Sequence, residues 1–323
     1  MKIMRKLLFL ILLVFVFAAC GGNGGDNGVY EPEAAPEPTP IVAQDEEYED
    51  IDEEPADEGV QGAEGGLRIV SVGPKVTEIV TELGFAAYIV GTDSHSVGID
   101  GLGDDLVLFD MMALDGEALV ALGPDFVLMA GIVMGAGDHI VMLENIGIDA
   151  MLVPGAGSIN GIYDTIRLVA WFLGAEAEGE RIIADMQAEV AEIMAIAATI
   201  ENRRTVYFEI DPAPMFSFGG GTFLNELLET VGAVNIFADE YGWIMVADEH
   251  ILVANPDVIM TNVGWLDDPL GDMAARPGWD GLDAVAMGRL YQVDGDATSR
   301  ANHNTVIALR QMAEAIYPEY FSQ

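Results

Sequence analysis

Two stretches of this chain repeat one pattern, and that repetition constrains the fold more than any other feature. The first begins at Glu117 and reads EALVALGPDFVLM, and the second begins at Glu249 and reads EHILVANPDVIM. In each, an acidic residue opens a short helix, a Pro-Asp pair prevents the helix from continuing, and an apolar run typical of a buried strand follows. Asp115 is the candidate N-cap of the first helix. The repetition predicts two similar lobes.

The N-terminal segment predicts export. Three basic residues within the first six precede an apolar run from Leu7 to Ala19, and Cys20 follows. This run is too short for a normal membrane-spanning helix. Its ending resembles the lipobox of bacterial lipoproteins, which implies that residues 1–19 are a signal peptide and that Cys20 is the site of lipid attachment. Because the chain has no second cysteine, it forms no internal disulfide.

Residues 20–66 have the composition of an extended tether. The segment from Gly21 to Gly66 contains fifteen Asp and Glu residues and no Lys or Arg. Such a segment cannot bury enough apolar surface to offset the entropy of ordering, and its charges repel one another. An ion-binding role for the acidic run is the alternative, but the run lacks the glycine spacing of a calcium loop. We therefore expect a disordered tether.

The rest of the chain alternates strand-like and helix-like segments. This order predicts an α/β fold with largely parallel sheets and helices on both faces. The segment from Ala175 to about Ile200 is long and amphipathic, and it predicts a single rigid helix between two Rossmann-like lobes. The expected boundaries are an N-terminal lobe over 67–174, a connecting helix over 175–203 and a C-terminal lobe over 204–323. The expected strands are 68–72, 87–91, 126–129, 150–153, 205–210, 258–261 and 290–293, and the expected helices are 75–83, 142–146, 159–173, 222–231, 248–254 and 304–317.

The charge of the chain excludes some partners. The formal net charge is −41, of which about −29 falls on residues 67–323. A surface this acidic argues against nucleic acid and anionic lipid as binding partners. The sequence also lacks the usual signatures of catalysis, because it has no GxSxG or HExxH motif, no P-loop Lys-Ser/Thr and no cysteine after Cys20. We expect no catalytic residues, no resident cofactor or metal, and a monomer; a surface adhesin without a small ligand is a further alternative.

Several motifs of the chain resemble one known family. They are RIVSVGPKVTEIVTELG from Arg68, the two repeated stretches, GGTFLNELLETVGAVNIFAD from Gly220, RPGWDGLDAVAMGRLYQVD from Arg276, and the ending AEAIYPEYF. Together they are similar to the periplasmic binding proteins for vitamin B12, ferric siderophores and haem, over nearly all of residues 67–321. The resemblance implies a substrate-binding component of an ABC importer outside the cytoplasmic membrane, with ligand held in a shallow cleft between two lobes.

The resemblance also implies a role for the two repeated glutamates. In that family a glutamate on each lobe docks on the permease dimer that works with the ATPase subunits, and Glu117 and Glu249 match these positions by motif. Carboxylate–guanidinium pairs provide the geometric specificity that such docking needs. The alternative is that each acid only stabilises the first turn of its helix, by about 0.3–1 kcal/mol.

Loops that follow the predicted strands supply the candidate ligand contacts. In α/β folds, ligands bind at these strand ends. Aromatic and methionine side chains outnumber cations in the loops, which favours a large and fairly neutral ligand: a corrinoid first, a ferric hydroxamate second and haem third. The tryptophans are as compatible with packing at a lobe edge as with ligand contact, and methionines are more often core residues than ligand contacts. The candidate contacts are Lys75, Ser94, His95, Met112, Met134, Met215, Phe216, Trp243, Trp265, Arg300 and His303, with His95 and His303 the candidate axial ligands of a chelated metal.

Overall fold

The computed structural model describes residues 66–131, 133 and 135–321, which belong to one compact unit. The predicted signal peptide, Cys20, nearly all of the predicted tether and Met134 lie outside the described residues. Among the residues that are described, no helix is long and apolar enough to cross a membrane. The predicted domain boundaries stay predictions.

The N-terminal sheet is parallel, and its strand order is β3-β2-β1-β4-β5. β1 and β4 are buried along their whole length because helices cover both faces of the sheet. In chain order the strands are β1 (Ile69–Val72), β2 (Ile89–Asp93), β3 (Val107–Phe109), β4 (Phe126–Ala130) and β5 (Asp149–Val153), and the helices are α1 (Pro74–Val80), α2 (Gly116–Leu122) and α3 (Ala136–Asn145).

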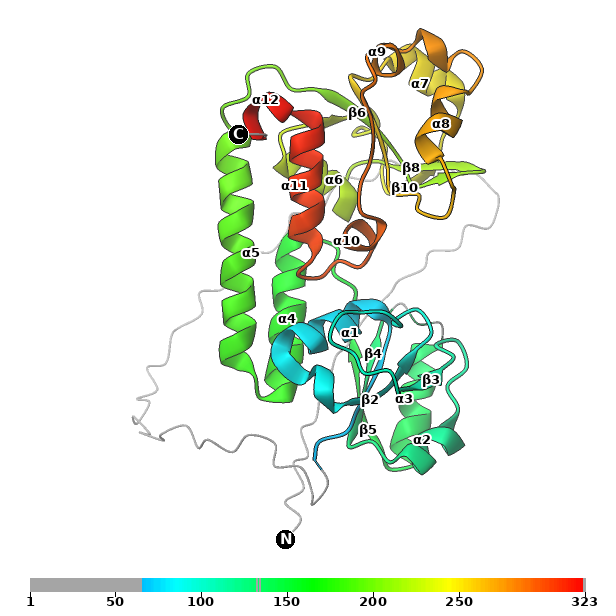
Figure 1. Cartoon of the computed structure of the whole chain (residues 1–323), viewed down its shortest axis with the longest axis vertical. Coiled ribbons are helices and arrows are strands. Elements are labelled where there is room, and N and C mark those ends of the chain that lie inside the picture. The colour runs from blue at the N-terminus through cyan, green and yellow to red at the C-terminus, as the bar shows by residue number, and fades with distance from the viewer. Residues whose placement is uncertain (1–65, 132, 134, 322–323) are drawn as a thin grey trace, which may run out of the picture. The chain divides into compact units, whose positions relative to one another are not determined.

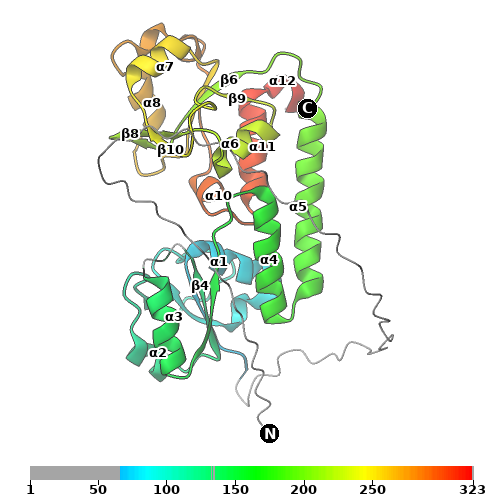
Figure 2. The same cartoon turned by 180° about the vertical axis from the view of Figure 1, so that it is seen from behind.

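Two long helices connect the N-terminal sheet to the C-terminal part of the chain (Figure 1). α4 (Ile159–Leu173) ends at Gly174 in the left-handed conformation, and α5 (Glu176–Ala197) runs back along it. The helices pack closely at Gly179, where an added Cβ would lie 2.6 Å from the Cβ of Ala170. Figure 2 shows the same pair from behind. α5 is the long amphipathic helix that the sequence predicted, shorter by three residues at its end.

The C-terminal part contains a parallel sheet and a small antiparallel sheet. The parallel strands lie in the order β12-β11-β6-β9, and the antiparallel strands in the order β10-β8-β7. The strands are β6 (Thr205–Glu209), β7 (Asp211–Pro212), β8 (Met215–Phe218), β9 (Val234–Asn235), β10 (Trp243–Met245), β11 (Val258–Thr261) and β12 (Leu290–Gln292). The helices are α6 (Phe223–Thr230), α7 (Asp248–Ala254), α8 (Pro269–Ala274), α9 (Asp283–Ala286), α10 (Gly295–Ser299), α11 (Thr305–Ile316) and α12 (Pro318–Phe321).

The two parallel sheets have the same topology. The order β2-β1-β4-β5 in the first corresponds to β9-β6-β11-β12 in the second, and β3 is the additional edge strand of the first. The repeated stretches occupy equivalent places, since each provides a short helix followed by the strand beside the first strand of its lobe. The prediction of two similar α/β lobes is confirmed.

The aspartate of each Pro-Asp pair forms a hydrogen bond that links two neighbouring strands. The Asp125 carboxylate accepts the backbone N–H of Arg68, just before β1, at 2.8 Å. The Asp257 carboxylate accepts the backbone N–H of Thr205, the first residue of β6, also at 2.8 Å. Each aspartate therefore aligns the start of one central strand with the start of the next. This shared contact is a structural reason for the repeated Pro-Asp.

The structure differs from the sequence prediction in several elements. The strand expected at residues 87–91 begins at Ile89, because Thr81–Phe85 form a π-turn and Ala86–Tyr88 a 3₁₀ turn after α1. α3 begins at Ala136, six residues before the predicted start. The antiparallel strands β7, β8 and β10 were not predicted, because β7 is two residues long and β10 three, too short for an alternating pattern.

Candidate functional site

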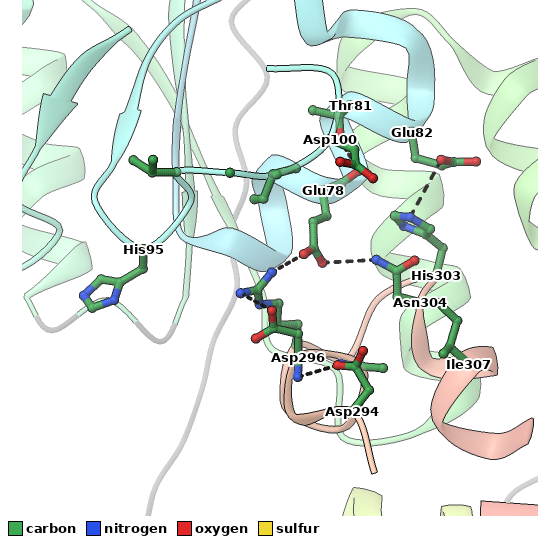
Figure 3. A pocket seen from close by; sticks show the side chains of 15 residues that line it. Glu78, Thr81, Glu82, His95, Asp100, Asp294, Asp296, His303, Asn304 and Ile307 are labelled. Carbon is green, nitrogen blue, oxygen red and sulfur yellow. Dashed lines mark hydrogen bonds and ion pairs between the residues drawn. The ribbon is translucent and has the colours of Figure 1, made fainter. Parts of the chain in front are cut away.

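Two adjoining cavities lie where the strand ends of the first sheet meet the segment from α10 to α11, and Figure 3 shows the side chains that line one of them, which includes Glu78 and His303. His95 and Arg300 line both cavities. The first, here called the apolar cavity, has a volume of about 430 Å³ and is lined by Gly73, Pro74, Lys75, His95, Met111, Ala130, Gly155, Ala156, Ser299, Arg300 and Ala301. The second, here called the acidic cavity, has a volume of about 470 Å³, and its lining includes Glu78, Glu82, Asp100, Asp294, Asp296 and His303.

The loop after β1 forms one wall of the apolar cavity. Gly73 has a φ of 102°, and an added Cβ would lie 2.6 Å from the Cβ of Ala130, so only glycine fits this position. Its backbone N–H donates to the buried carboxylate of Asp93 at 2.7 Å. Asp93 also accepts the hydroxyl of Ser96 at 2.7 Å and the N–H of His95 at 2.9 Å. One carboxylate therefore fixes the ends of β1 and β2 together.

Buried hydroxyl groups support the same loops from behind. Thr77 on α1 lies 2.8 Å from the Ser71 hydroxyl and 3.3 Å from the Ser96 hydroxyl. Thr92 donates to the Ser71 carbonyl at 2.9 Å. All four side chains are fully buried. Because buried polar groups are costly unless they are paired, this network favours one arrangement of the loops.

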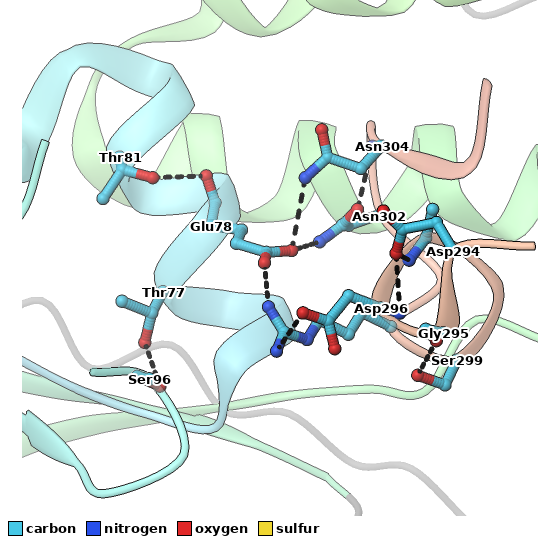
Figure 4. Close-up of polar contacts among 12 residues, drawn as sticks. Thr77, Glu78, Thr81, Ser96, Asp294, Gly295, Asp296, Ser299, Asn302 and Asn304 are labelled. Carbon is cyan, nitrogen blue, oxygen red and sulfur yellow. Dashed lines mark hydrogen bonds and ion pairs between the residues drawn. The ribbon is translucent and has the colours of Figure 1, made fainter. Parts of the chain in front are cut away.

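A buried carboxylate joins α1 to the segment that follows α10 (Figure 4). Glu78 is 8% exposed and accepts hydrogen bonds from the Arg300 guanidinium and the Asn302 amide. The Asn304 amide donates to the same carboxylate at 3.4 Å. Arg300 also pairs with Asp296 at 2.8 Å. The two lobes are therefore connected by a charge-assisted contact at the floor of the cleft.

His303 lies beside this contact and faces the acidic cavity. Its Nε2 is 3.8 Å from a carboxylate oxygen of Glu82, and its Nδ1 is buried without a hydrogen-bond partner among the described residues (Figure 3). Burial lowers the pKa of His303, although Glu82 and Glu78 oppose the shift. The ring points toward Glu82, in the turn after α1, whereas His95 lies on a separate loop after β2.

Lys75 lies inside the apolar cavity with its stem buried. The residue is 7% exposed, and its Nζ donates to the Pro154 carbonyl at 2.6 Å. Burial lowers the pKa of Lys75 from its usual value of 10.5 to about 8. The side chain therefore remains mostly charged at neutral pH, in a place where charge is disfavoured.

Lys75, His95 and Arg300 are the predicted contacts that the structure brings to the apolar cavity. Ser94 is exposed beside His95, and Met112 is 49% exposed beside Met111, which does line the cavity. The aromatic candidates lie elsewhere: Trp243 on β10 is 58% exposed and packs edge-on against Phe218, and Trp265 is 63% exposed. Met215 and Phe216 are half-buried on β8 and do not line either cavity. The ligand contacts stay predictions.

The sequence did not single out Glu78 or Ala156 as parts of the cleft, and from the loop that carries Met111 and Met112 it indicated Met112, whereas Met111 lines the cavity. Glu78 had a signal, because it is an acid inside the otherwise uncharged stretch VTEIV that precedes a second acid at Glu82. Ala156 had no such signal in the sequence, because an alanine in a glycine-rich loop has no polar or reactive side-chain group that would indicate a binding role. In the described part of the chain, no group of three or more His, Cys, Asp or Glu side chains is placed to hold a bare metal ion.

The helix that carries Glu249 is anchored through a second buried ion pair. Arg276 forms a bidentate pair with Glu209 at 2.6 and 2.7 Å, and Tyr207 donates to the same carboxylate at 3.0 Å. The guanidinium stacks on Trp279, 4.6 Å from the ring centroid. The Trp279 indole N–H donates at 2.6 Å to Asp248, the first residue of α7. Burial and the Glu209 charge raise the pKa of Tyr207, which keeps the phenol neutral.

Glu117 and Glu249 are both exposed in the first turn of equivalent helices, α2 and α7. Asp115 caps α2 as predicted, accepting the N–H groups of Glu117 at 2.9 Å and Ala118 at 3.1 Å. Neither glutamate side chain takes part in an ion pair within the described residues, and neither lines a cavity at the cleft. Both carboxylates are therefore available to a partner.

Comparison with known proteins places this geometry in context. A family model described as "Periplasmic binding protein" matches residues 69–297. The uncharacterized ABC transporter substrate-binding lipoprotein YvrC of Bacillus subtilis is 29% identical over 326 residues, which cover 97% of each chain. The vitamin B12-binding protein of Salmonella choleraesuis is 27% identical over 252 residues, 77% of this chain and 90% of that protein. The crystal structure of a possible iron-binding (periplasmic solute-binding) protein from Staphylococcus epidermidis has a TM-score of 0.70 at 28% identity, and the match covers 77% of this chain and 98% of that one.

Proposed function

Because this chain belongs to the periplasmic binding protein family, we propose that it is the substrate-binding component of an ABC importer that captures a metal chelate. The observation that carries the proposal is a single cleft lined from both lobes. Lys75 and Ala156 come from the N-terminal lobe, and Ser299 and Ala301 come from the segment after β12. A cavity of about 430 Å³ with mostly apolar walls and few polar groups is typical of a small-molecule site.

The class of chelate follows from the relatives and from the lining. The Salmonella relative is named for vitamin B12 and the Staphylococcus structure is titled as possibly iron-binding, so neither chemistry is favoured by name. A corrinoid, a ferric siderophore and haem all fit the role. The absence of enzyme motifs in the sequence supports capture without chemical change, followed by delivery to a permease dimer with ATPase subunits.

The first test is isothermal titration calorimetry of the purified full chain with cyanocobalamin, haem and ferrichrome. We expect a dissociation constant below about 1 µM for one of the three, because a ligand held in a preformed cleft loses little conformational freedom. A chain that is folded by circular dichroism and binds none of these chelates would contradict the proposal.

We further propose that Cys20 carries a lipid anchor, since the layout of the first twenty residues and the lipoprotein name of the Bacillus relative agree. Cys20→Ser should move the protein from the membrane fraction to the soluble fraction of the expressing cells, because one acyl-modified residue supplies the anchoring. Retention of the variant in the membrane fraction would exclude anchoring through Cys20. Chelate affinity should stay unchanged in the soluble variant.

A further inference from the structure

The apolar cavity has a charge balance opposite to that of the whole chain. The sequence contains 54 Asp and Glu residues against 13 Lys and Arg. None of the described residues that line the apolar cavity is acidic, whereas Lys75, His95 and Arg300 all line it. The adjoining acidic cavity, by contrast, is lined by several Asp and Glu residues. No described residue that lines the cavity beside Lys75 carries a carboxylate, which points to a ligand that brings its own.

Lys75 is the only lysine of the chain after Lys6. Every other cation of residues 67–323 is an arginine, and the single lysine is one of the most buried charged side chains of the described part. Its hydrogen bond to the Pro154 carbonyl satisfies one of the three ammonium protons but does not neutralise the charge. A buried charge without a partner is costly, and an anion in the cavity would offset that cost.

Arg300 is a weaker candidate for binding an anionic ligand group, because carboxylates of the protein already balance its charge. Glu78 and Asp296 both pair with its guanidinium. Most of the remaining lining has no polar side chain, and its apolar side chains are those of Pro74, Met111, Ala130, Ala156 and Ala301. Among the described lining residues, Lys75 is therefore a cation without an ion-pair partner on a mostly apolar surface.

We infer that the chelate bound in the apolar cavity carries an anionic oxygen group, such as a carboxylate, on an otherwise apolar body, and that Lys75 selects for this group. This inference rests on the proposed function and names the substrate class of the same cleft. It favours chelates with a few carboxylates over neutral amide or hydroxamate chelates. Highly anionic ligands are disfavoured, because the folded part carries a net charge of about −29 and, among the described Lys and Arg residues that line the cavity, only Lys75 has no ion-pair partner.

The test compares chelates that differ only in this group. Calorimetry of the full chain would use haem against haem dimethyl ester, and a monocarboxylic acid of cyanocobalamin against cyanocobalamin itself. For the better-bound pair we expect the acid to bind at least about tenfold more tightly than its neutral partner, which is the effect of one charge-assisted contact. Lys75→Met should reduce this preference to within about twofold, because methionine keeps the length of the stem but not the charge.

Arg203→Met is the matched control. It also removes one positive charge, from an exposed residue just before β6 that does not line the cleft, and it should keep the full preference for the acid. Equal binding of acid and neutral partners by the wild-type chain, or an unchanged preference in Lys75→Met, would overturn the inference while leaving the transport role intact. Binding of ferrichrome but of none of the four probes would overturn the inference and leave the transport role intact, whereas binding of none of the four probes and no ferrichrome would contradict the proposed function as well.

Thermal unfolding separates loss of the contact from loss of the fold. Removing a buried and uncompensated charge should leave the melting temperature of Lys75→Met equal to or above that of the wild-type chain at pH 7. A variant that keeps its melting temperature and loses only the acid preference assigns the selection to Lys75. A clear fall in the melting temperature, with all chelates weakened equally, would mean that Lys75 is structural and would overturn the inference.

Discussion

Replacing both Glu117 and Glu249 with alanine is expected to abolish chelate uptake while the affinity for chelate stays unchanged. The two carboxylates are exposed, occupy the same position in equivalent helices, and lie outside the cavities of the cleft. The expectation is that the partner is a permease dimer, which presents the same surface twice, so that two equivalent acids on two equivalent lobes would match it. Uptake is measured with labelled chelate in cells, and affinity by calorimetry on the same double variant.

The matched control removes two other acids of the same kind. Asp138 and Asp272 are exposed acids in the first turns of α3 and α8, one in each lobe. Asp138→Ala with Asp272→Ala changes the net charge by the same amount and costs a similar helix-dipole stabilisation, about 0.3–1 kcal/mol for each helix. Uptake should persist in this control. Equal loss of uptake in both double variants would show that overall charge matters and not the two glutamates.

The sequence predicted the parts of the fold that depend on neighbouring residues. The repeat around Glu117 and Glu249 predicted helix, break and strand in both lobes, because proline and the left-handed residue before it, Gly123 or Asn255, end each helix locally. The 22-residue helix α5 was predicted from its apolar periodicity. The contribution of the Pro-Asp aspartates to strand alignment was not predicted, since Asp125 reaches a residue 57 positions away.

The cleft was predicted less well, for a related reason. Glu78 accepts a hydrogen bond from Arg300, which lies 222 positions later in the sequence, and no local sequence pattern predicts such a contact. Counting residue types in loops favoured aromatic contacts, yet Trp243 and Trp265 lie outside the two cavities while Lys75 is inside one of them. The composition of the loops shows how many side chains of each type are present, but it does not show which of them line the same cavity. A single buried lysine therefore carries more information about the ligand than several exposed aromatic rings.

Glu209→Gln is expected to cause the largest loss of stability of any single change considered for this chain. The side chains of Glu209 and Arg276 are 2% and 17% exposed, so glutamine would leave the largely buried guanidinium without the carboxylate that pairs with it. Breaking a buried pair from one side costs about 3–5 kcal/mol. For a folded part of this size, that corresponds to a fall of about 10 °C in the melting temperature. Differential scanning calorimetry measures both quantities.

Two further variants separate the buried pair from ion pairs in general. Glu180→Gln breaks the pair with Arg167. The side chains of Arg167 and Glu180 are 45% and 58% exposed, so this change should lower the free energy of unfolding by less than about 1 kcal/mol. Glu209→Gln combined with Arg276→Met removes both buried charges and should recover part of the lost stability, because no unpaired ion remains. A single Glu209→Gln variant as stable as Glu180→Gln would contradict this account of the pair.

The same pair links the core of the C-terminal lobe to its exposed surface. Arg276 stacks on Trp279, and Trp279 donates to Asp248, the residue before Glu249. Glu209 holds the Arg276 guanidinium in place. A more mobile guanidinium should also make the first turn of α7, which carries Glu249, more mobile. Glu209→Gln, assayed below its melting temperature, should therefore reduce uptake more than it reduces chelate affinity. An equal reduction of both would show that α7 is held in place independently of the buried pair.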